Sequence, residues 1–209
     1  CIRDSSGAYL RSFGGYGNAC YQWQYARQFT IYNDVVYIAD TYGRKVKSLT
    51  LTGQCKDIWF TGQYPHAIAA NSNYVFVGHP SNNISILDHR LNQRTTRSIN
   101  SNYLSYSWGM SINPAGNRLA IADYNKNHVV EFSISGDWLA YTQKTSSTYS
   151  SGNGYFQRPT DTGYDISGNI YVSDLYGHRV QKFNSSLVYQ SKVGSYSTSS
   201  GFRYPYGMH

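Results

Sequence analysis

The segment Val36-Tyr37-Ile38-Ala39-Asp40 has three variants further along this chain. They are Val75-Phe76-Val77-Gly78-His79, Leu119-Ala120-Ile121-Ala122-Asp123 and Ile170-Tyr171-Val172-Ser173-Asp174. The last residues of successive copies are 39, 44 and 51 residues apart. Each copy is a short apolar run of the kind that forms a buried strand. Repetition at this period predicts an architecture built from one recurring structural unit.

The residues around each apolar run indicate four strands per repeat. A turn such as Tyr32-Asn33-Asp34 precedes the run, and Asn and Asp tolerate the left-handed backbone of a tight hairpin. A polar bend and a third strand follow it, as in Asp174–Phe183, and a fourth, more irregular strand comes next, as in Asp137–Tyr141. Four short antiparallel strands per repeat predict an all-β chain, a β-propeller of four-stranded blades.

The segment Gly168–Phe183 resembles the NHL repeat, in which an apolar strand and an Asp lead through a bend to His-Arg-Val and a further strand. Asp34–Leu49 carries Arg44-Lys45-Val46 at the corresponding positions. Asn127-His128-Val129 replaces the basic pair in the third repeat, and the second repeat departs most, with His79 in place of the Asp. The resemblance implies a propeller scaffold, which by itself specifies no activity.

The repeats predict a single propeller over residues 1–209. Full blades are expected at 25–62, 63–104, 105–146 and 157–194, the last strand of a partial blade at 1–14, and the start of a further blade at 203–209. Two interpretations of the partial blade stay open. The chain is a piece of a longer protein, which the usual six blades of NHL-like propellers favour, or its unpaired strands are completed by another chain.

The composition suits an exported protein. Only 14% of the 209 residues are charged, 40% are apolar, and 22 are Tyr. No apolar run approaches the roughly 18 residues of a membrane-spanning helix, so no transmembrane segment is expected. Asn83-Ile84-Ser85 and Asn184-Ser185-Ser186 match the glycosylation sequon, so Asn83 and Asn184 are candidate acceptors. We therefore expect an extracellular or cell-surface location.

The three cysteines match no zinc or redox motif. Cys20 falls in the loop entering the first full blade, and Cys55 falls in the fourth strand of that blade. Two alternatives stay open for this pair: a disulfide between them, or two buried free thiols. Cys1 is then left to pair with absent sequence, with another chain or with nothing. A lipid-bearing start of a bacterial lipoprotein is a further alternative for Cys1.

The sequence offers no catalytic or metal-ligating set, and no cofactor is predicted. Asp40, Asp123 and Asp174 recur at strand ends, where they are expected to brace the backbone and an adjacent basic side chain. Most histidines also recur one per repeat, and His128 and His178 are interpreted as hydrogen-bonded bend residues. Peptide-amidating lyases have an NHL-like propeller with a histidine-bound metal, so a metal-dependent lyase stays an alternative. Here His66 and His79 belong to one repeat without a third partner.

Connectors between blades and bends between second and third strands open on the same face of a propeller. These segments are rich in Tyr, Trp and Arg, the residue types that dominate recognition surfaces. Trp23, Tyr64 and Trp108 precede first strands and are expected to be buried. The residues predicted to line a partner-binding face are Tyr16, Tyr42, Arg44, Tyr124, Lys126, Arg158, Tyr176, His178 and Arg203.

The net charge of +7 favours anionic partners. Some NHL-like propellers bind single-stranded RNA through a basic face with stacking aromatics, so RNA binding is an alternative. Here the 18 Lys and Arg residues are spread over all repeats without a cluster. The sequence therefore favours an extracellular, non-enzymatic propeller that binds protein or glycan, or assembles with copies of itself into filaments through its terminal strands.

Overall fold

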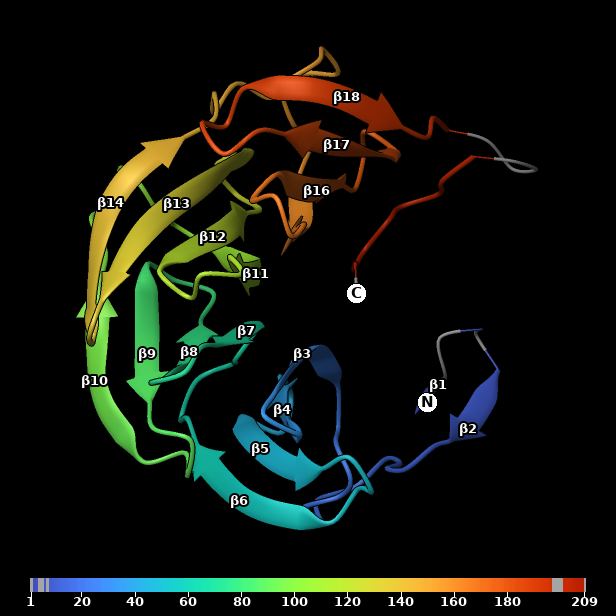
Figure 1. The fold of residues 1–209 in the computed structure, drawn as a ribbon, viewed down its shortest axis with the longest axis vertical. Coiled ribbons are helices and arrows are strands. Elements are labelled where there is room, and N and C mark those ends of the chain that lie inside the picture. Colours follow the sequence, from blue (N-terminus) through green and yellow to red (C-terminus); the bar gives the residue numbers. More distant parts are fainter. Residues whose placement is uncertain (1, 4–5, 7, 197–200, 209) are drawn as a thin grey trace.

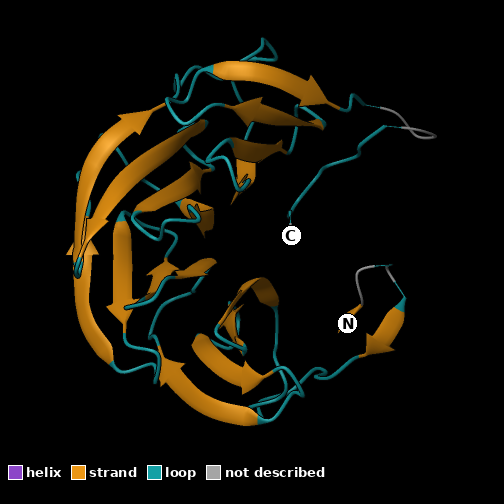
Figure 2. Ribbon diagram, in the orientation of Figure 1, coloured by secondary structure: helices purple, strands orange, loops and turns teal. Residues whose placement is uncertain are grey.

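A computed structural model describes residues 2–3, 6, 8–196 and 201–208. This part of the chain contains strands and turns and no helix (Figure 2). Four antiparallel sheets of four strands follow one another along the chain, each with its strands in sequence order. The fold is the predicted all-β propeller, in which every blade is a simple up-and-down sheet.

The first two blades begin at Ala26 and Ala67. The first comprises β3 (Ala26–Tyr32), β4 (Val35–Asp40), β5 (Lys45–Thr50) and β6 (Cys55–Phe60). The second comprises β7 (Ala67–Ala70), β8 (Val75–Gly78), β9 (Asn83–Leu87) and β10 (Gln93–Ser98).

The third and fourth blades repeat this order. The third comprises β11 (Ser107–Ile112), β12 (Arg118–Asp123), β13 (His128–Ser135) and β14 (Trp138–Lys144). The fourth comprises β15 (Pro159–Tyr164), β16 (Ile170–Asp174), β17 (Arg179–Phe183) and β18 (Tyr189–Val193).

Turn chemistry explains where the strands reverse. Asn33 and Asp34, between β3 and β4, have φ angles of 48° and 60°, the left-handed backbone that a two-residue hairpin requires. The bends between second and third strands share one feature, since Arg44, Asn127 and His178 have φ angles of 50°, 53° and 52°. These three equivalent residues give the bends of the first, third and fourth blades the same course.

The blades are arranged in an arc around a common axis, with the first strands near the centre and the fourth strands on the outside (Figure 1). The apolar core lies between neighbouring blades. Phe76 of β8 and Phe132 of β13 belong to one cluster between the second and third blades, and Phe183 belongs to another between the third and fourth. The second strands β8 and β12 pack between two adjacent sheets, and β4 packs between the second blade and the loop that carries Trp23, which is why these strands are continuous apolar runs.

The recurring carboxylates brace the corners of the blades, as predicted. Asp40 accepts hydrogen bonds from the backbone N–H groups of Gln24 and Tyr25 and pairs with Lys47 at 2.9 Å. Asp174 accepts from the N–H of Gln157 and from the guanidinium of Arg179 in the same way. Each carboxylate thereby ties the connector that enters a blade to the bend that follows its second strand.

The third blade has the same arrangement, with a histidine in place of the Lys or Arg side chain. Asp123 accepts from the N–H groups of Ser105, Asn125 and Lys126, while His128 Nε2 lies 3.9 Å away and bonds to the carbonyl of Tyr103 at 2.9 Å. Burial raises the pKa of Asp123 and lowers that of His128 to about 4. His128 is therefore a neutral donor at neutral pH, and the backbone N–H groups, rather than an ion pair, hold the Asp123 carboxylate in place.

Cys20 and Cys55 form a disulfide, which confirms one of the two alternatives. It joins the loop before β3 to the first residue of β6, so the entry to the first blade is fixed covalently to its outer strand. Cys1 lies outside the described residues. None of the described segments is a helix with the length and apolarity to cross a bilayer.

The stretch 1–14, expected to hold one strand, contains two short ones that pair with each other, β1 (Ile2–Arg3) and β2 (Tyr9–Arg11). At the other end, residues 203–208 form no strand but run beside β15. The carbonyl of Pro205 accepts from the Thr160 hydroxyl, and the N–H of Met208 donates to Asp161.

Candidate functional site: an aromatic face around the propeller axis

The centre of the site is a stack of four side chains that crosses three blades. Arg27 of β3 lies over the ring of Trp108 of β11, 4.0 Å from its centroid. The other face of Trp108 stacks on Tyr124 at 4.2 Å with an interplanar angle of 20°. Arg158 in turn lies 4.8 Å from the centroid of Tyr124 and donates to its carbonyl. Two cations thus enclose two aromatic rings, an arrangement that cation–π attraction stabilises by about 1–2 kcal/mol per pair when it is partly desolvated.

Further tyrosines extend the stack on the side of the first blade. Tyr25 packs against Tyr42 at 5.0 Å, and Tyr42 meets Tyr64 edge to face at 6.4 Å. Arg44 lies over the ring of Tyr64 and donates to its hydroxyl at 2.7 Å. Tyr42 is 57% exposed, and Tyr64, expected to be buried, is 39% exposed. Tyr64 lies outward because the Arg44 guanidinium reaches across from the neighbouring bend to hold it.

A second extension runs over the fourth blade. Tyr124 and Tyr176 interact through their hydroxyls, and together with burial this contact raises the pKa of Tyr124. Tyr176 meets Tyr204 edge to face at 5.8 Å, and His178 packs on Tyr204 at 4.8 Å. The surface formed by these side chains is called the aromatic face below; its members are Tyr25, Arg27, Tyr42, Arg44, Tyr64, Tyr106, Trp108, Tyr124, Arg158, Tyr176, His178, Tyr204 and Tyr206.

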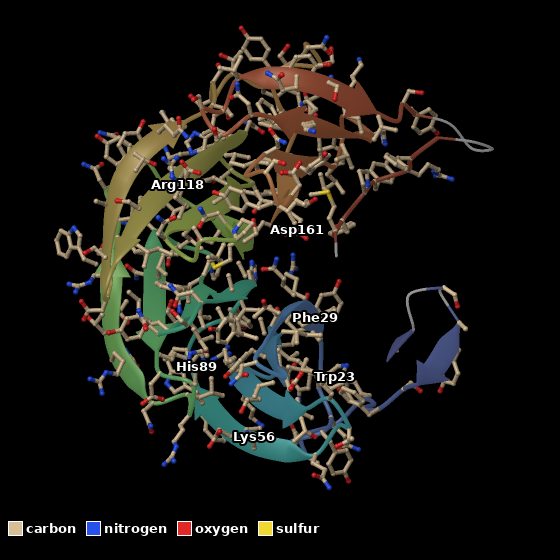
Figure 3. All side chains as sticks on the ribbon, in the orientation of Figure 1. Trp23, Phe29, Lys56, His89, Arg118 and Asp161 are labelled. Carbon is tan, nitrogen blue, oxygen red and sulfur yellow. A yellow bond between two sulfur atoms is a disulfide. The ribbon has the colours of Figure 1, made fainter. Side chains whose placement is uncertain are left out.

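Beneath the aromatic face, Gln28 and Asp161 close the channel along the axis. The Gln28 amide donates to the carbonyl of Met110 at 3.0 Å and to Asp161 at 2.8 Å, and it accepts from the N–H groups of Ile68 and Met110. Asp161 also accepts from the N–H groups of Thr162 and Met208. One side chain therefore joins the first strands of all four blades. Asp161 lies near the centre of the arc in Figure 3.

The Gln28 and Asp161 pair separates two cavities. The smaller, of 70 Å³, lies on the side of the aromatic face and is lined by Arg27, Trp108 and Tyr206 as well as by the pair itself. The larger, of 420 Å³, continues along the first strands on the other side. Burial raises the pKa of Asp161 to about 7, and the N–H donors oppose that shift. The carboxyl group thus changes charge near neutral pH.

The histidines near the axis are neutral at neutral pH. Burial and the neighbouring Arg27 lower the pKa of His66 to about 3, and burial lowers that of His79 to about 4. His66 packs on the rings of Tyr106 and Trp108, at 5.1 and 5.6 Å, and His79 Nε2 bonds to the Ser85 hydroxyl. Among the described residues, no three His, Cys, Asp or Glu side chains are grouped so that they could hold a metal ion.

Six of the nine residues predicted for the partner-binding face make ring contacts on the aromatic face: Tyr42, Arg44, Tyr124, Arg158, Tyr176 and His178. The other three make no ring contact with it in the described part of the chain. Tyr16 is 82% exposed in the loop before β3, Lys126 borders a separate cavity with Asn82 and Ser101, and Arg203 is exposed next to Tyr204.

The predicted set lacked Arg27 and Trp108, which form the middle of the stack. A usable signal existed in the repeat. One place in successive repeats, at or next to the start of the first strand in the four full blades, holds Arg27, His66, Trp108, Thr160 and Tyr206, and four of the five are large or ionisable. The first strands lie nearest the axis, where the blades come together (Figure 1). Trp23 and Trp108, both expected to be buried, are half-buried.

Comparisons with known proteins agree with the propeller fold. The sequence model of the family described as NHL repeat matches residues 156–183. No curated protein matches the chain.

Two solved structures share its fold. A selenomethionine-substituted virginiamycin B lyase from Staphylococcus aureus superposes with a TM-score of 0.61 at 13% identity, covering 79% of this chain and 54% of that one. A hydrazine synthase from Kuenenia stuttgartiensis has a TM-score of 0.60 at 14% identity, covering 76% and 45%. This chain therefore spans about half the length of the solved structures that it resembles, and the likeness concerns the fold.

Proposed function

We propose that this chain, an NHL-repeat β-propeller, is an extracellular, non-enzymatic binding module whose aromatic face docks an acidic protein or glycan. The observation that supports this most is the stack of Arg27, Trp108, Tyr124 and Arg158, flanked by the exposed Tyr42 and Tyr176. Rigid aromatic and Arg side chains lose little entropy on binding, which makes them effective anchors. Net charge of +7 adds attraction for an acidic partner.

The same stack favours protein or glycan over single-stranded RNA. RNA-binding platforms need free ring faces on which bases stack. Here Arg27 and Tyr124 cover the two faces of Trp108, and Trp108 and Arg158 cover those of Tyr124. Tyr42 and Tyr176 are exposed, and a tyrosine combines an apolar ring with a polar hydroxyl, which suits contacts with protein or glycan. Salt screens the attraction to any acidic partner, so we expect affinity to fall moderately with salt, whereas RNA binding, which neutralises several phosphates, would weaken much more steeply between low and moderate salt.

The covalent chemistry supports an extracellular location. Disulfides such as Cys20–Cys55 persist in oxidising compartments and are rare in the cytosol. Asn83 and Asn184 remain proposed glycosylation acceptors. Asn83 begins β9, and Asn184 uses its side-chain oxygen to accept from the N–H groups of Ser186 and Val188 in the turn before β18. Glycan attachment at Asn184 leaves that oxygen free for the turn, because it occurs at the amide nitrogen.

The lyase alternative rests on the resemblance to peptide-amidating lyases, and the virginiamycin B lyase shares only the fold with this chain. His66 packs on Trp108, and His79 Nε2 bonds to Ser85, while Nδ1 of each ring is buried without a hydrogen-bond partner among the described residues. The two rings have no third ligand grouped with them in that part of the chain. Elemental analysis of purified protein tests this alternative directly. Stoichiometric zinc that is lost in a His66→Phe variant would favour the lyase over the binding module.

A double variant tests the proposed binding face. Tyr42→Ser with Tyr176→Ser removes two exposed rings that belong to different blades, and Ile166→Ser, at a residue 96% exposed in the β15–β16 turn, is the control. Ligands are first selected on the unaltered protein from a displayed peptide library and a printed glycan array. We expect their affinity to fall at least about tenfold in the double variant, because aromatic anchors each contribute about 1–2 kcal/mol or more, and to stay unchanged in the control.

Copies of this chain are a further candidate partner. Sedimentation or size-exclusion mass measured at two concentrations tests self-association. A mass that rises with concentration, and rises less in the Tyr42→Ser and Tyr176→Ser variant, would assign the aromatic face to contacts between copies. A mass that rises equally in both proteins would assign the contacts between copies to other surfaces, such as the terminal strands.

A further inference from the structure

The disulfide of the first blade joins two places in the repeat that recur in the third blade. Cys20 belongs to the connector that enters the first blade, 20 residues before Asp40, and its partner Cys55 begins β6. Tyr103 belongs to the connector that enters the third blade and lies 20 residues before Asp123, the equivalent carboxylate. Tyr103 is therefore the counterpart of Cys20.

The fourth strand of the third blade supplies the second counterpart. Cys55 pairs with Leu49 across β5 and β6, beside a shift in the strand register. Tyr141 pairs with Phe132 across β13 and β14, also beside a shift in register. Leu49 and Phe132 are each the fifth residue of the third strand in their blade, so Tyr141 occupies the place of Cys55.

The fold brings these two places into contact in the fourth blade as well. Gly154 lies 20 residues before Asp174, and Tyr189 pairs with Phe183, the fifth residue of β17. A Cβ atom added to Gly154 would lie 3.5 Å from the Cβ atom of Tyr189. Of these three blades, the first and third carry a pair of side chains at the two places that oxidation can join.

Tyr103 and Tyr141 are in closer contact than aromatic pairs usually are. Their rings stack with centroids 3.9 Å apart and an interplanar angle of 10°. Aromatic pairs more often lie about 4.5–7 Å apart in offset or edge-to-face arrangements. The next closest pair of tyrosines in the described part of the chain, Tyr25 and Tyr42, is 5.0 Å apart and tilted by 36°. The ortho carbons beside each hydroxyl of the stacked pair therefore lie against the other ring.

Both stacked rings are fixed by their surroundings and accessible from solvent. The N–H of Tyr103 donates to the carbonyl of Asn100 at 2.8 Å, and the Tyr103 carbonyl accepts from His128 Nε2 at 2.9 Å. Tyr141 belongs to β14, and its ring meets Phe132 edge to face at 6.5 Å. Tyr141 is 38% exposed, and the half-buried Tyr103 keeps its hydroxyl oxygen accessible.

We propose that Tyr103 and Tyr141 are a site of oxidative cross-linking, at which a peroxidase with hydrogen peroxide joins the two rings as dityrosine. Each phenol loses one electron and one proton to become a phenoxyl radical, and the two radicals form a carbon–carbon bond between ortho carbons. The hydrogen atoms on those carbons then move to the oxygens, which restores both phenols. The two electrons and two protons reduce hydrogen peroxide to two molecules of water, so the protein loses two hydrogen atoms.

The new bond ties the connector that enters the third blade to the outer strand of that blade, as the disulfide does in the first blade. The modification requires oxidising surroundings, which are also those in which disulfides persist. Neither tyrosine belongs to the aromatic face, so the site does not depend on the function proposed for that face.

Peptide mapping of dilute protein treated with a plant peroxidase and hydrogen peroxide tests the proposal. After trypsin digestion, Tyr103 lies in peptide 98–118 and Tyr141 is the one tyrosine of peptide 127–144. We expect these two peptides to appear joined in the monomeric protein, with a mass two hydrogen atoms below the sum of their separate masses. Free tyrosine in a parallel reaction checks that the oxidant is active.

Phenylalanine variants separate the stacked pair from the other tyrosines. Tyr103→Phe and Tyr141→Phe keep the rings and their packing but lack the phenolic hydrogen, so each is expected to abolish the joined peptides. Tyr106→Phe is the matched control, because Tyr106 is the other tyrosine of peptide 98–118. The cross-link is expected to form in this control with the yield of the unaltered protein.

Three results would overturn the proposal. The first is the absence of joined peptides 98–118 and 127–144 under conditions that couple free tyrosine. The second is an equal yield of these joined peptides in Tyr103→Phe or in Tyr141→Phe. The third is a higher yield of coupling between Tyr25 and Tyr42, because the wider and tilted pair is expected to react less than the stacked one.

Discussion

Gln28 and Asp161 show how two polar residues can join a propeller at its axis. Gln28 uses its amide in four hydrogen bonds to β7, β11 and β15, and Asp161 adds bonds to its own strand and to Met208. Every donor and acceptor of the pair has a partner, so the burial of these groups is compensated. Loss of either residue would leave several buried backbone groups without a hydrogen-bond partner, and each such group lowers the free energy of unfolding by about 1–3 kcal/mol.

Asp161 makes the stability of the protein depend on pH. Its pKa is about 7 in the folded protein, against 3.8 as the reference value. Between these values the folded state holds a proton that the unfolded chain has lost, so the contribution to stability is present at low pH and disappears as pH rises through 7. We expect the free energy of unfolding, relative to that of an Asp161→Asn variant, to fall by on the order of 3 kcal/mol between pH 4 and 8.

Urea unfolding of both proteins at several pH values measures this difference. The comparison with Asp161→Asn matters because His66, His79 and His128 have lowered pKa values and contribute the opposite trend in both proteins. If the substitution changes the free energy of unfolding by the same amount at every pH, the slope of the difference against pH stays the same. A difference that stays level or grows with pH would show that Asp161 is ionised throughout.

Prediction from sequence succeeded for residues that recur and failed for those that do not. The bracing role of Asp40, Asp123 and Asp174 was predictable because the same residue returns at the same strand end. Gln28 and Asp161 were not, since the equivalent positions in the other repeats hold Ala67 and Gly109, and only the assembled axis brings the polar pair together. The contact between Gln28 and Asp161 joins two different residue types in two different blades, so it does not appear as a repeated residue in the sequence.

At the scale of elements, the loop before β3 is fixed to the first blade at two points. The Cys20–Cys55 disulfide joins it to β6. Beside the disulfide, the buried ammonium of Lys47 donates to the carbonyls of Ala19 and Gln22 and to Asp40. Trp23, at the end of this loop, packs against Phe13 and the apolar side of β4. The loop therefore covers an apolar surface that would otherwise be open.

A Cys20→Ser and Cys55→Ser variant should be less stable by about 3 kcal/mol, because the disulfide restricts a loop of 35 residues in the unfolded chain. Denaturant unfolding of the variant and the unaltered protein gives this difference. Hydrogen exchange adds the location, with faster exchange expected at residues 17–24 and unchanged exchange in β11–β14. Equal stability of the two proteins, or faster exchange spread over all blades, would contradict this role for the disulfide.

Strand prediction worked best where burial is complete. The second strands β4, β8 and β12 are covered on both faces, so their sequences are continuous apolar runs that can be recognised without the structure. The outer strands β6, β10, β14 and β18 are largely exposed and were harder to define, since their composition resembles that of turns. The hairpin of β1 and β2 was taken for one strand because β1 is only two residues long.

On the scale of the whole molecule, the arrangement of the blades accounts for the aromatic face. Every blade has the same strand order, so the connectors and the bends after second strands all reach the same side of the arc (Figure 1). Side chains that lie far apart in the sequence thereby become neighbours, as Arg27 and Trp108 do. The repeat predicted a shared face, but the partners within the stack depend on the curvature of the arc.

Hydrogen–deuterium exchange with a selected peptide or glycan bound tests most directly that the bends of successive blades form one binding face. The account predicts simultaneous protection of residues 41–44, 124–127 and 175–178, which belong to three blades, with no change at the opposite turns 33–34, 71–73 and 166–168. Protection confined to a single blade, or found at the opposite turns instead, would contradict it.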